Sequence, residues 1–128
     1  MDILLVDDNE DYLMLMKDML YANGYSVITA TDGLIACKIL DLKHVDLIIS
    51  DIKMPKLDGI TLHAYARELD EYRDTTFIFI TGYKDVFEDV LTLDPSKDFL
   101  LDKTTPATEI IAKVNALMFG KFIGSHES

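Results

Sequence analysis

Five short apolar runs alternate with five helical patterns along the 128 residues, and this alternation limits the fold more than any other feature. Strands separated by helices are typical of α/β folds with a parallel sheet. The sequence predicts strands near 2–6, 25–30, 46–50, 76–81 and 98–101. It predicts helices near 10–22, 33–41, 58–69, 84–92 and 106–119. The length suits one domain with a hydrophobic core, and we place it at 1–120.

Four of the apolar runs lead into residues that carry an acid, a hydroxyl or an amine. These residues are Asp7 and Asp8 after 3–6, Asp51 after 47–50, Thr81 and then Gly82 after 77–80, and Asp102 and then Lys103 after 99–101. The carboxyl ends of parallel strands meet at one edge of a sheet, and ligands of open α/β sheets bind there. We therefore expect these residues to form one site.

Three carboxylates at one edge of a sheet repel one another. Two unit charges ~4 Å apart cost about 4 kcal/mol at an effective dielectric of 20, and a divalent cation removes that cost. Mg²⁺ prefers oxygen ligands and keeps waters for substrate phosphates. Asp7, Asp8 and Asp51 are thus a candidate Mg²⁺ site, with Mn²⁺ as an alternative. Lys103 offers a mobile charge for a phosphoryl oxygen, and Gly82 leaves a backbone N–H open beside the Thr81 hydroxyl.

Composition excludes several classes of function. The net charge of −11 argues against direct nucleic-acid binding, which depends on Lys and Arg. No segment approaches the ~18 apolar residues of a membrane span, and no signal peptide is present, so we expect a cytoplasmic protein. The single cysteine, Cys37, fits a reducing compartment and a core position. His44, His63 and His126 follow no ligand spacing and suit surface or packing roles.

The first and last helices carry the remaining local predictions. Helical spacing gives the first helix a core-facing stripe of Tyr12, Leu15, Met16, Met19 and Leu20. Asn23-Gly24 is a stop signal for that helix, and Gly120 is expected to end the last one. Residues 121–128 would then be a short tail, either frayed, the start of a linker or an artificial remnant.

The polar residues also lie in motifs of a known family. These motifs are Val6-Asp7-Asp8-Asn9, the Asp-x-x-Met-Pro-x-x-Asp-Gly stretch from Asp51 to Gly59, Ile80-Thr81-Gly82-Tyr83, and Lys103. With these motifs in this order, the chain resembles a two-component response-regulator receiver domain of the chemotaxis-receiver type. The resemblance covers 1–120 and implies a flavodoxin-like three-layer fold, with strand order 2-1-3-4-5 and five helices. Asp58-Gly59 within the long motif is more simply read as a turn and helix start than as chemistry.

The resemblance implies roles for the site residues. Asp51 would accept a phosphoryl group from a phosphohistidine on a sensor histidine kinase or phosphotransfer protein. Asp8 and Asp51 would bind Mg²⁺ directly, Asp7 through water, and Lys53 through its backbone carbonyl. Lys103 would pair with a carboxylate at rest and with the phosphoryl group after transfer, while Thr81 would move to hydrogen-bond that group. Lys53 and Tyr83 occupy positions that influence hydrolysis of the phosphorylated state.

Two departures from the family lie near Lys103. Most receivers follow this lysine with proline in a cis peptide, whereas Thr104 stands here, and a cis bond before a non-proline residue costs ~3–4 kcal/mol. We expect a trans peptide, an altered loop course and a Lys103 side chain that is less tightly held. Leu100 also replaces the aromatic residue of the usual switch, and Phe99 points to the opposite face of the strand.

Three functions are consistent with these residues. The first is a phosphorylation-dependent signalling module in a phosphorelay, which alters its binding to a downstream protein and is not a turnover enzyme. The second is a constitutive docking module with an impaired switch. The third is a haloacid-dehalogenase-like phosphohydrolase, although Asn9 stands where that family wants a second Asp. Leu13 and Met14 of the first helix are either exposed docking residues or shallowly buried.

Overall fold

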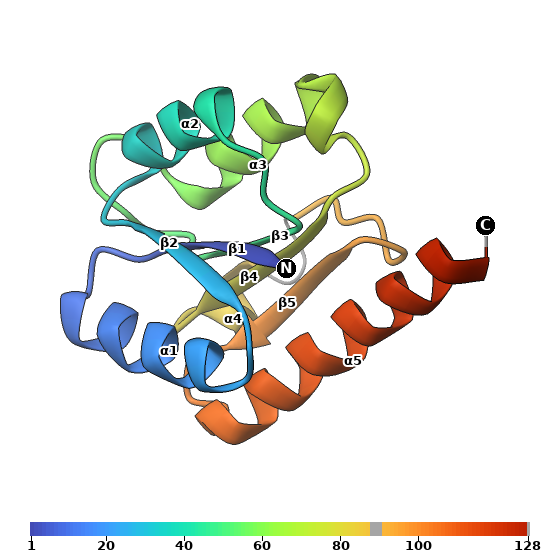
Figure 1. The fold of residues 1–128 in the computed structure, drawn as a ribbon. Helices are drawn as coiled ribbons and strands as arrows, with labels where there is room; N and C mark the ends of the chain where they lie inside the picture. Colours follow the sequence, from blue (N-terminus) through green and yellow to red (C-terminus); the bar gives the residue numbers. More distant parts are fainter. Residues whose placement is uncertain (88–90, 128) are drawn as a thin grey trace.

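A five-stranded parallel sheet is the frame of the protein in a computed structural model that describes residues 1–87 and 91–127 (Figure 1). The strands are β1 (Asp2–Val6), β2 (Ser26–Ala30), β3 (Leu47–Ser50), β4 (Thr76–Thr81) and β5 (Asp98–Asp102). Their order is β2-β1-β3-β4-β5, and every neighbouring pair is parallel. The predicted flavodoxin-like fold class and strand order are therefore confirmed.

Helices connect the strands and cover both faces of the sheet (Figure 1). They are α1 (Glu10–Ala22), α2 (Gly33–Leu42), α3 (Gly59–Glu68), a 3₁₀ turn at Asp70–Tyr72, α4 (Lys84–Phe87) and α5 (Ala107–Glu127). The fourth helix, predicted over 84–92, begins as expected, but residues 88–90 lie outside the described part of the chain. None of the helices in the described residues, α5 included, combines the length and apolar composition needed to cross a bilayer.

The two predicted glycine stops behave differently. Gly24 has a φ of +91°, the left-handed conformation that favours glycine, and it follows the end of α1 as predicted. The prediction that Gly120 ends the last helix is wrong, because α5 continues through it to Glu127. Glycine in place of alanine inside a helix costs only about 0.5–1 kcal/mol, so a glycine alone does not end a helix. The domain boundary at 120 stays a prediction.

Two hydrophobic layers sandwich the sheet. Leu4 and Val6 of β1 face the layer under α2 and α3, whereas Ile3 and Leu5 face the layer under α1 and α5. All four residues of β3 are buried, as expected for a central parallel strand covered on both faces. Cys37 is a buried free cysteine of the α2 layer, so the predicted core role is confirmed.

The buried face of α1 differs from the prediction at one position. Leu15 was expected in the core but is 52% exposed, and Leu13 is buried instead, together with Met16 and Leu20. Both leucines fit a helical spacing, so the spacing alone could not choose between them. Leu13 and Met14 were expected to be either exposed docking residues or shallowly buried. Leu13 lies in the core, whereas Met14 is 67% exposed.

An ion-pair cluster joins the beginning of β3 to the 3₁₀ turn at the opposite edge from the strand carboxyl ends. His44 Nδ1 lies 2.8 Å from Glu71 Oε1, and its Nε2 lies 3.2 Å from Asp46 Oδ1. The hydrogen bond to Glu71, aided by Asp46, raises the pKa of His44 above its usual value of 6.5. The protonated imidazole therefore favours the folded state.

This cluster gives a pH-dependent contribution to stability. Because the folded pKa is raised, the contribution is complete below pH 6.5 and is lost as the pH rises through the folded value. We expect His44→Gln to lower the free energy of unfolding at pH 5.5 by less than about 1 kcal/mol, since the side chain is 59% exposed and screened. Urea unfolding should show a smaller difference at pH 8.5, and an equal difference at both pH values would contradict the ion-pair role.

Candidate functional site

Asp51 lies directly after β3, beside the end of β1. Strand register pairs Val6 with Ser50, and the Asp51 N–H donates to the Val6 carbonyl at 2.9 Å. One carboxylate oxygen, Oδ1, accepts the N–H of Ile52 at 2.7 Å. The side chain is 11% exposed, so Asp51 is held by backbone contacts but still open at the sheet edge.

Asp7, Asp8 and Asp51 form an acidic cluster, as the sequence predicted. Each offers a carboxylate oxygen, and these oxygens all lie within 4.8 Å of one another. Burial raises the pKa of Asp7, and the Asp51 charge adds to this, while Lys103 and the Asn9 amide oppose it. The donor set fits Mg²⁺, because hard oxygen ligands combine with an exposed Asp8 where waters can remain. The Lys53 carbonyl stays a prediction as a ligand.

Lys103 reaches into this cluster. Its Nζ lies 2.8 Å from Asp7 Oδ2 and 3.2 Å from Asp51 Oδ2. Burial alone would lower the pKa of Lys103, but the carboxylates of Asp7 and Asp51 outweigh burial and raise it. The ammonium therefore stays charged and offsets part of the repulsion between the two acids.

The loop after Lys103 contains the predicted trans peptide, since the described residues hold no cis bond. The Lys103 N–H donates to the Thr81 carbonyl at 2.9 Å. The Thr104 N–H and hydroxyl both donate to Asp102 Oδ1, at 2.8 and 2.7 Å. These hydrogen bonds hold the loop without proline, and the looser hold on Lys103 stays a prediction.

Thr81 and Gly82 lie at the end of β4, on the same edge of the sheet. Thr81 is fully buried, and its Oγ1 accepts the N–H of Tyr83 at 3.1 Å. Gly82 is exposed, and an added β-carbon would meet nothing within 4 Å, so its surroundings are open to a ligand. Lys53 and Tyr83 contact each other, with Lys53 Nζ 4.3 Å from the centre of the tyrosine ring.

Leu100 and Phe99 face opposite sides of the sheet, as predicted. Leu100 packs against the layer under α2 and α3. Phe99 packs against the layer under α1 and α5, and Lys113 Nζ lies 4.7 Å from its ring centre. Phe99 therefore does not replace the missing aromatic residue at position 100.

The Asp58-Gly59 pair is structural, in agreement with the interpretation as a helix start. Asp58 caps α3 by accepting the N–H of Thr61 at 2.7 Å. Gly59 lies so close to Asp51 that a β-carbon at position 59 would sit 2.1 Å from the Asp51 carbonyl oxygen. The glycine lets the loop fold back against the chain at Asp51.

Tyr12 and Asn9 are site residues that sequence reasoning missed. Tyr12 was assigned to the core, but its ring centre lies 4.6 Å from Lys103 Nζ. Burial raises the pKa of Tyr12 to about 12, so its phenol is neutral. Asn9 caps α1 by accepting the Tyr12 N–H at 3.1 Å. The sequence signal that could have placed Tyr12 at the site was its position in the first turn of the helix that follows an acidic strand end.

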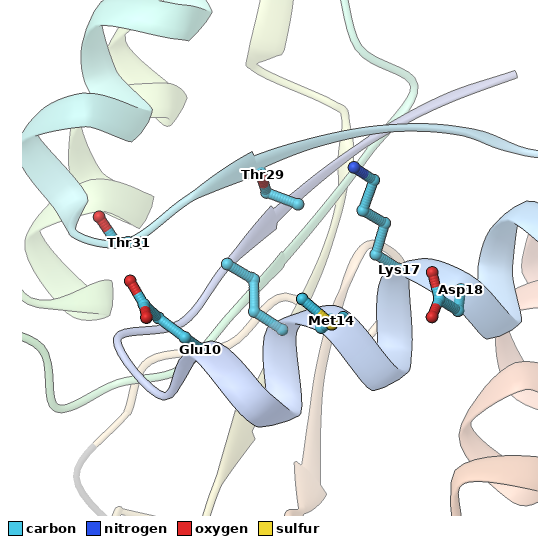
Figure 2. Close-up of a pocket in the computed structure, with 7 residues that line it drawn as sticks. Glu10, Met14, Lys17, Asp18, Thr29 and Thr31 are labelled. Atoms are coloured by element: carbon cyan, nitrogen blue, oxygen red, sulfur yellow. The ribbon is translucent and has the colours of Figure 1, made fainter.

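A cavity of about 410 Å³ lies between α1 and the end of β2. Figure 2 shows Lys17 extending from α1 toward the strand that carries Thr29. Exposed Met14 is among the lining residues, and none of the site carboxylates is. This cavity is therefore a surface feature beside the site and not the site itself.

Comparisons of both the sequence and the fold with known proteins agree with the resemblance to receiver domains. The family model of the response regulator receiver domain matches residues 3–115 of this chain. The alkaline phosphatase synthesis transcriptional regulatory protein PhoP of Bacillus subtilis (strain 168) is 34% identical over 116 residues, covering 91% of this chain and 48% of that protein. The chain thus spans about half the length of the curated relatives it matches.

Two solved structures share both fold and sequence. The Thermotoga maritima response regulator TrrA, in complex with Mg²⁺–BeF, has a TM-score of 0.79 and 30% identity, covering 91% of this chain and 97% of that one. The receiver domain of a Pseudomonas aeruginosa PAO1 sensor histidine kinase, with a magnesium ion in its active-site cleft, has a TM-score of 0.80 and 25% identity, covering 90% and 94%. The chain therefore belongs to the response regulator receiver domain family of two-component systems.

Proposed function

We propose that this receiver accepts a phosphoryl group on Asp51 from a phosphohistidine of a sensor histidine kinase or phosphotransfer protein, in a Mg²⁺-dependent reaction. The observation that carries the proposal is the Lys103 ammonium, which bridges Asp7 and Asp51 inside a cluster of three carboxylates. The phosphorylated domain then changes its affinity for a downstream protein. The domain itself does not bind nucleic acid, in keeping with its net charge of −11.

The chemistry is a phosphoryl transfer that balances within the two proteins. An Asp51 oxygen bonds to phosphorus, the bond from phosphorus to the imidazole nitrogen breaks, and the imidazole leaves with that electron pair. Such transfers depend mainly on positioning and charge neutralisation. Lys103, already 3.2 Å from Asp51, supplies a positive charge for the phosphoryl oxygens. Mg²⁺ held by Asp8 and Asp51, with Asp7 through water and the Lys53 carbonyl, would add further neutralisation.

Thr81 and Gly82 would respond to the phosphoryl group. The Thr81 hydroxyl accepts a hydrogen bond from the Tyr83 N–H and keeps its own proton to donate. Gly82 adds an amide in open surroundings. Donation to the phosphoryl oxygens would draw the end of β4 toward Asp51, and this movement would carry the signal to the outer face.

A second candidate function is constitutive docking. It is favoured by Leu100, which has no ring to rotate when Thr81 moves. Exposed Met14 on α1 offers an apolar contact whose accessibility does not depend on phosphorylation. Partner affinity measured with and without acetyl phosphate separates the two functions, because only the signalling function predicts a change.

Phosphorylation is expected at Asp51 alone. Wild-type protein incubated with acetyl phosphate and Mg²⁺ should gain the ~80 Da of one phosphoryl group in intact-mass measurement. Asp51→Asn should gain nothing. Asp58→Asn is the matched control, since asparagine keeps the helix cap, and it should be modified like wild type. A full adduct on Asp51→Asn would refute the assignment.

Mg²⁺ affinity should depend on Asp8. We expect Asp8→Ala to weaken binding by about tenfold or more, because it removes a direct oxygen ligand from the acidic cluster. Asp11→Ala removes an equal charge from an exposed position on α1 and should have a smaller effect. Isothermal titration with MgCl₂ measures both, and unchanged affinity in Asp8→Ala would remove the metal assignment.

Hydrolysis of the phosphorylated state should be slowed by the Lys53–Tyr83 pair. The two side chains contact each other, and their bulk would screen the in-line approach of water to Asp51. We expect Tyr83→Ala to lose the phosphoryl group several-fold faster than wild type. Tyr21→Ala, at an exposed tyrosine of α1, is the control. A Tyr83→Ala half-life no shorter than that of wild type would contradict the screening.

A further inference from the structure

We propose that Tyr12 is a positioning residue for phosphoryl transfer, whose ring face keeps the Lys103 ammonium beside Asp51. Lys103 Nζ lies 4.6 Å from the ring centre, inside the ~6 Å range of cation–π attraction. The same nitrogen lies 3.2 Å from Asp51 Oδ2. This inference rests on the proposed function, because it concerns the lysine that would meet the phosphoryl group.

A closed set of contacts fixes the ring relative to the site. The Asn9 N–H donates to Asp7 Oδ1 at 2.8 Å, and Asn9 Oδ1 accepts the Tyr12 N–H at 3.1 Å. Lys103 lies over the Tyr12 ring and also forms a 2.8 Å ion pair with Asp7, which closes the set of contacts. Asp7 thus orients both the first turn of α1 and the lysine, and the tyrosine lies between them.

Of these three lysine contacts, the ring is the one that neither phosphoryl transfer nor metal binding alters chemically. At rest Lys103 is held by Asp7, Asp51 and the ring. Transfer would convert the Asp51 carboxylate into an acyl phosphate, whose negative charge lies on the phosphoryl oxygens, and metal binding would engage Asp7. A free lysine side chain has high rotamer entropy, so an unchanged contact reduces the cost of moving the ammonium from the carboxylates to the phosphoryl oxygens. The ring keeps the ammonium close to the phosphoryl oxygens throughout.

The hydroxyl of Tyr12 takes no part in this role. It is buried and has no hydrogen-bond partner within the part of the chain that the structure describes. An unpaired buried hydroxyl lowers stability, so its removal is expected to stabilise the fold. Phenylalanine at position 12 therefore keeps the positioning contact, whereas an apolar residue without a ring removes it.

The test compares Tyr12→Phe with Tyr12→Leu in two measurements. NMR of the ¹³C-lysine-labelled protein should show the Lys103 ε-methylene protons shifted upfield by the ring in wild type and Tyr12→Phe, and unshifted in Tyr12→Leu. Binding of beryllium fluoride with Mg²⁺, as a phosphoryl mimic, should be about three- to tenfold weaker in Tyr12→Leu, the loss expected for one cation–π contact. The Tyr12→Phe variant should bind beryllium fluoride with an affinity within about twofold of wild type.

A double variant separates positioning from a general loss of structure. In a Lys103→Ala background, Tyr12→Leu should cause no further loss of beryllium fluoride binding, and an equal loss in both backgrounds would overturn the role. Tyr12→Met is a second ring-free variant and should match Tyr12→Leu. Wild-type protein that takes up neither acetyl phosphate nor beryllium fluoride would overturn the proposed function itself. Wild-type uptake with undiminished binding in both ring-free variants would overturn only the role of Tyr12.

Discussion

The repulsion between carboxylates at the ends of β1 and β3 is the constraint on which the site depends. Parallel pairing brings Asp7 and Asp51 to one edge, and burial makes the charge on Asp7 costly. The Lys103 ammonium offsets this cost at rest by pairing with both acids. An acidic site whose repulsion is offset by an ammonium also suits a divalent cation, because the cation adds positive charge where the carboxylates lie together.

The parts of the site that follow from strand ends could be predicted from the sequence. Apolar runs located β1, β3, β4 and β5, and parallel topology then required Asp7, Asp51, Thr81 and Lys103 to share an edge. Local signals also identified the cap at Asp58 and the turn at Gly24, since both depend on neighbouring residues. These features are encoded within a few residues of where they act.

The parts that the sequence left undetermined depend on the orientation of side chains in three dimensions. The choice of Leu13 over Leu15 for the core is set by how α1 is rotated on the sheet, and either residue fits a helical period. The contact between Tyr12 and Lys103 joins the first helix to the last strand end, so no local pattern could reveal it. The hydrogen bonds from Thr104 to Asp102 were likewise not predicted, because they depend on the path that the loop takes without proline.

The close approach of Gly59 to the Asp51 carbonyl has a consequence for how this protein can vary. With only 2.1 Å between that oxygen and an added β-carbon, even alanine would push the backbone at Asp51 out of place. The limit comes from two backbone segments and not from a reacting group, so no compensating side chain elsewhere can relieve it. Evolution can therefore alter the acids and the lysine gradually, by changing affinity or rate, whereas position 59 offers no intermediate step.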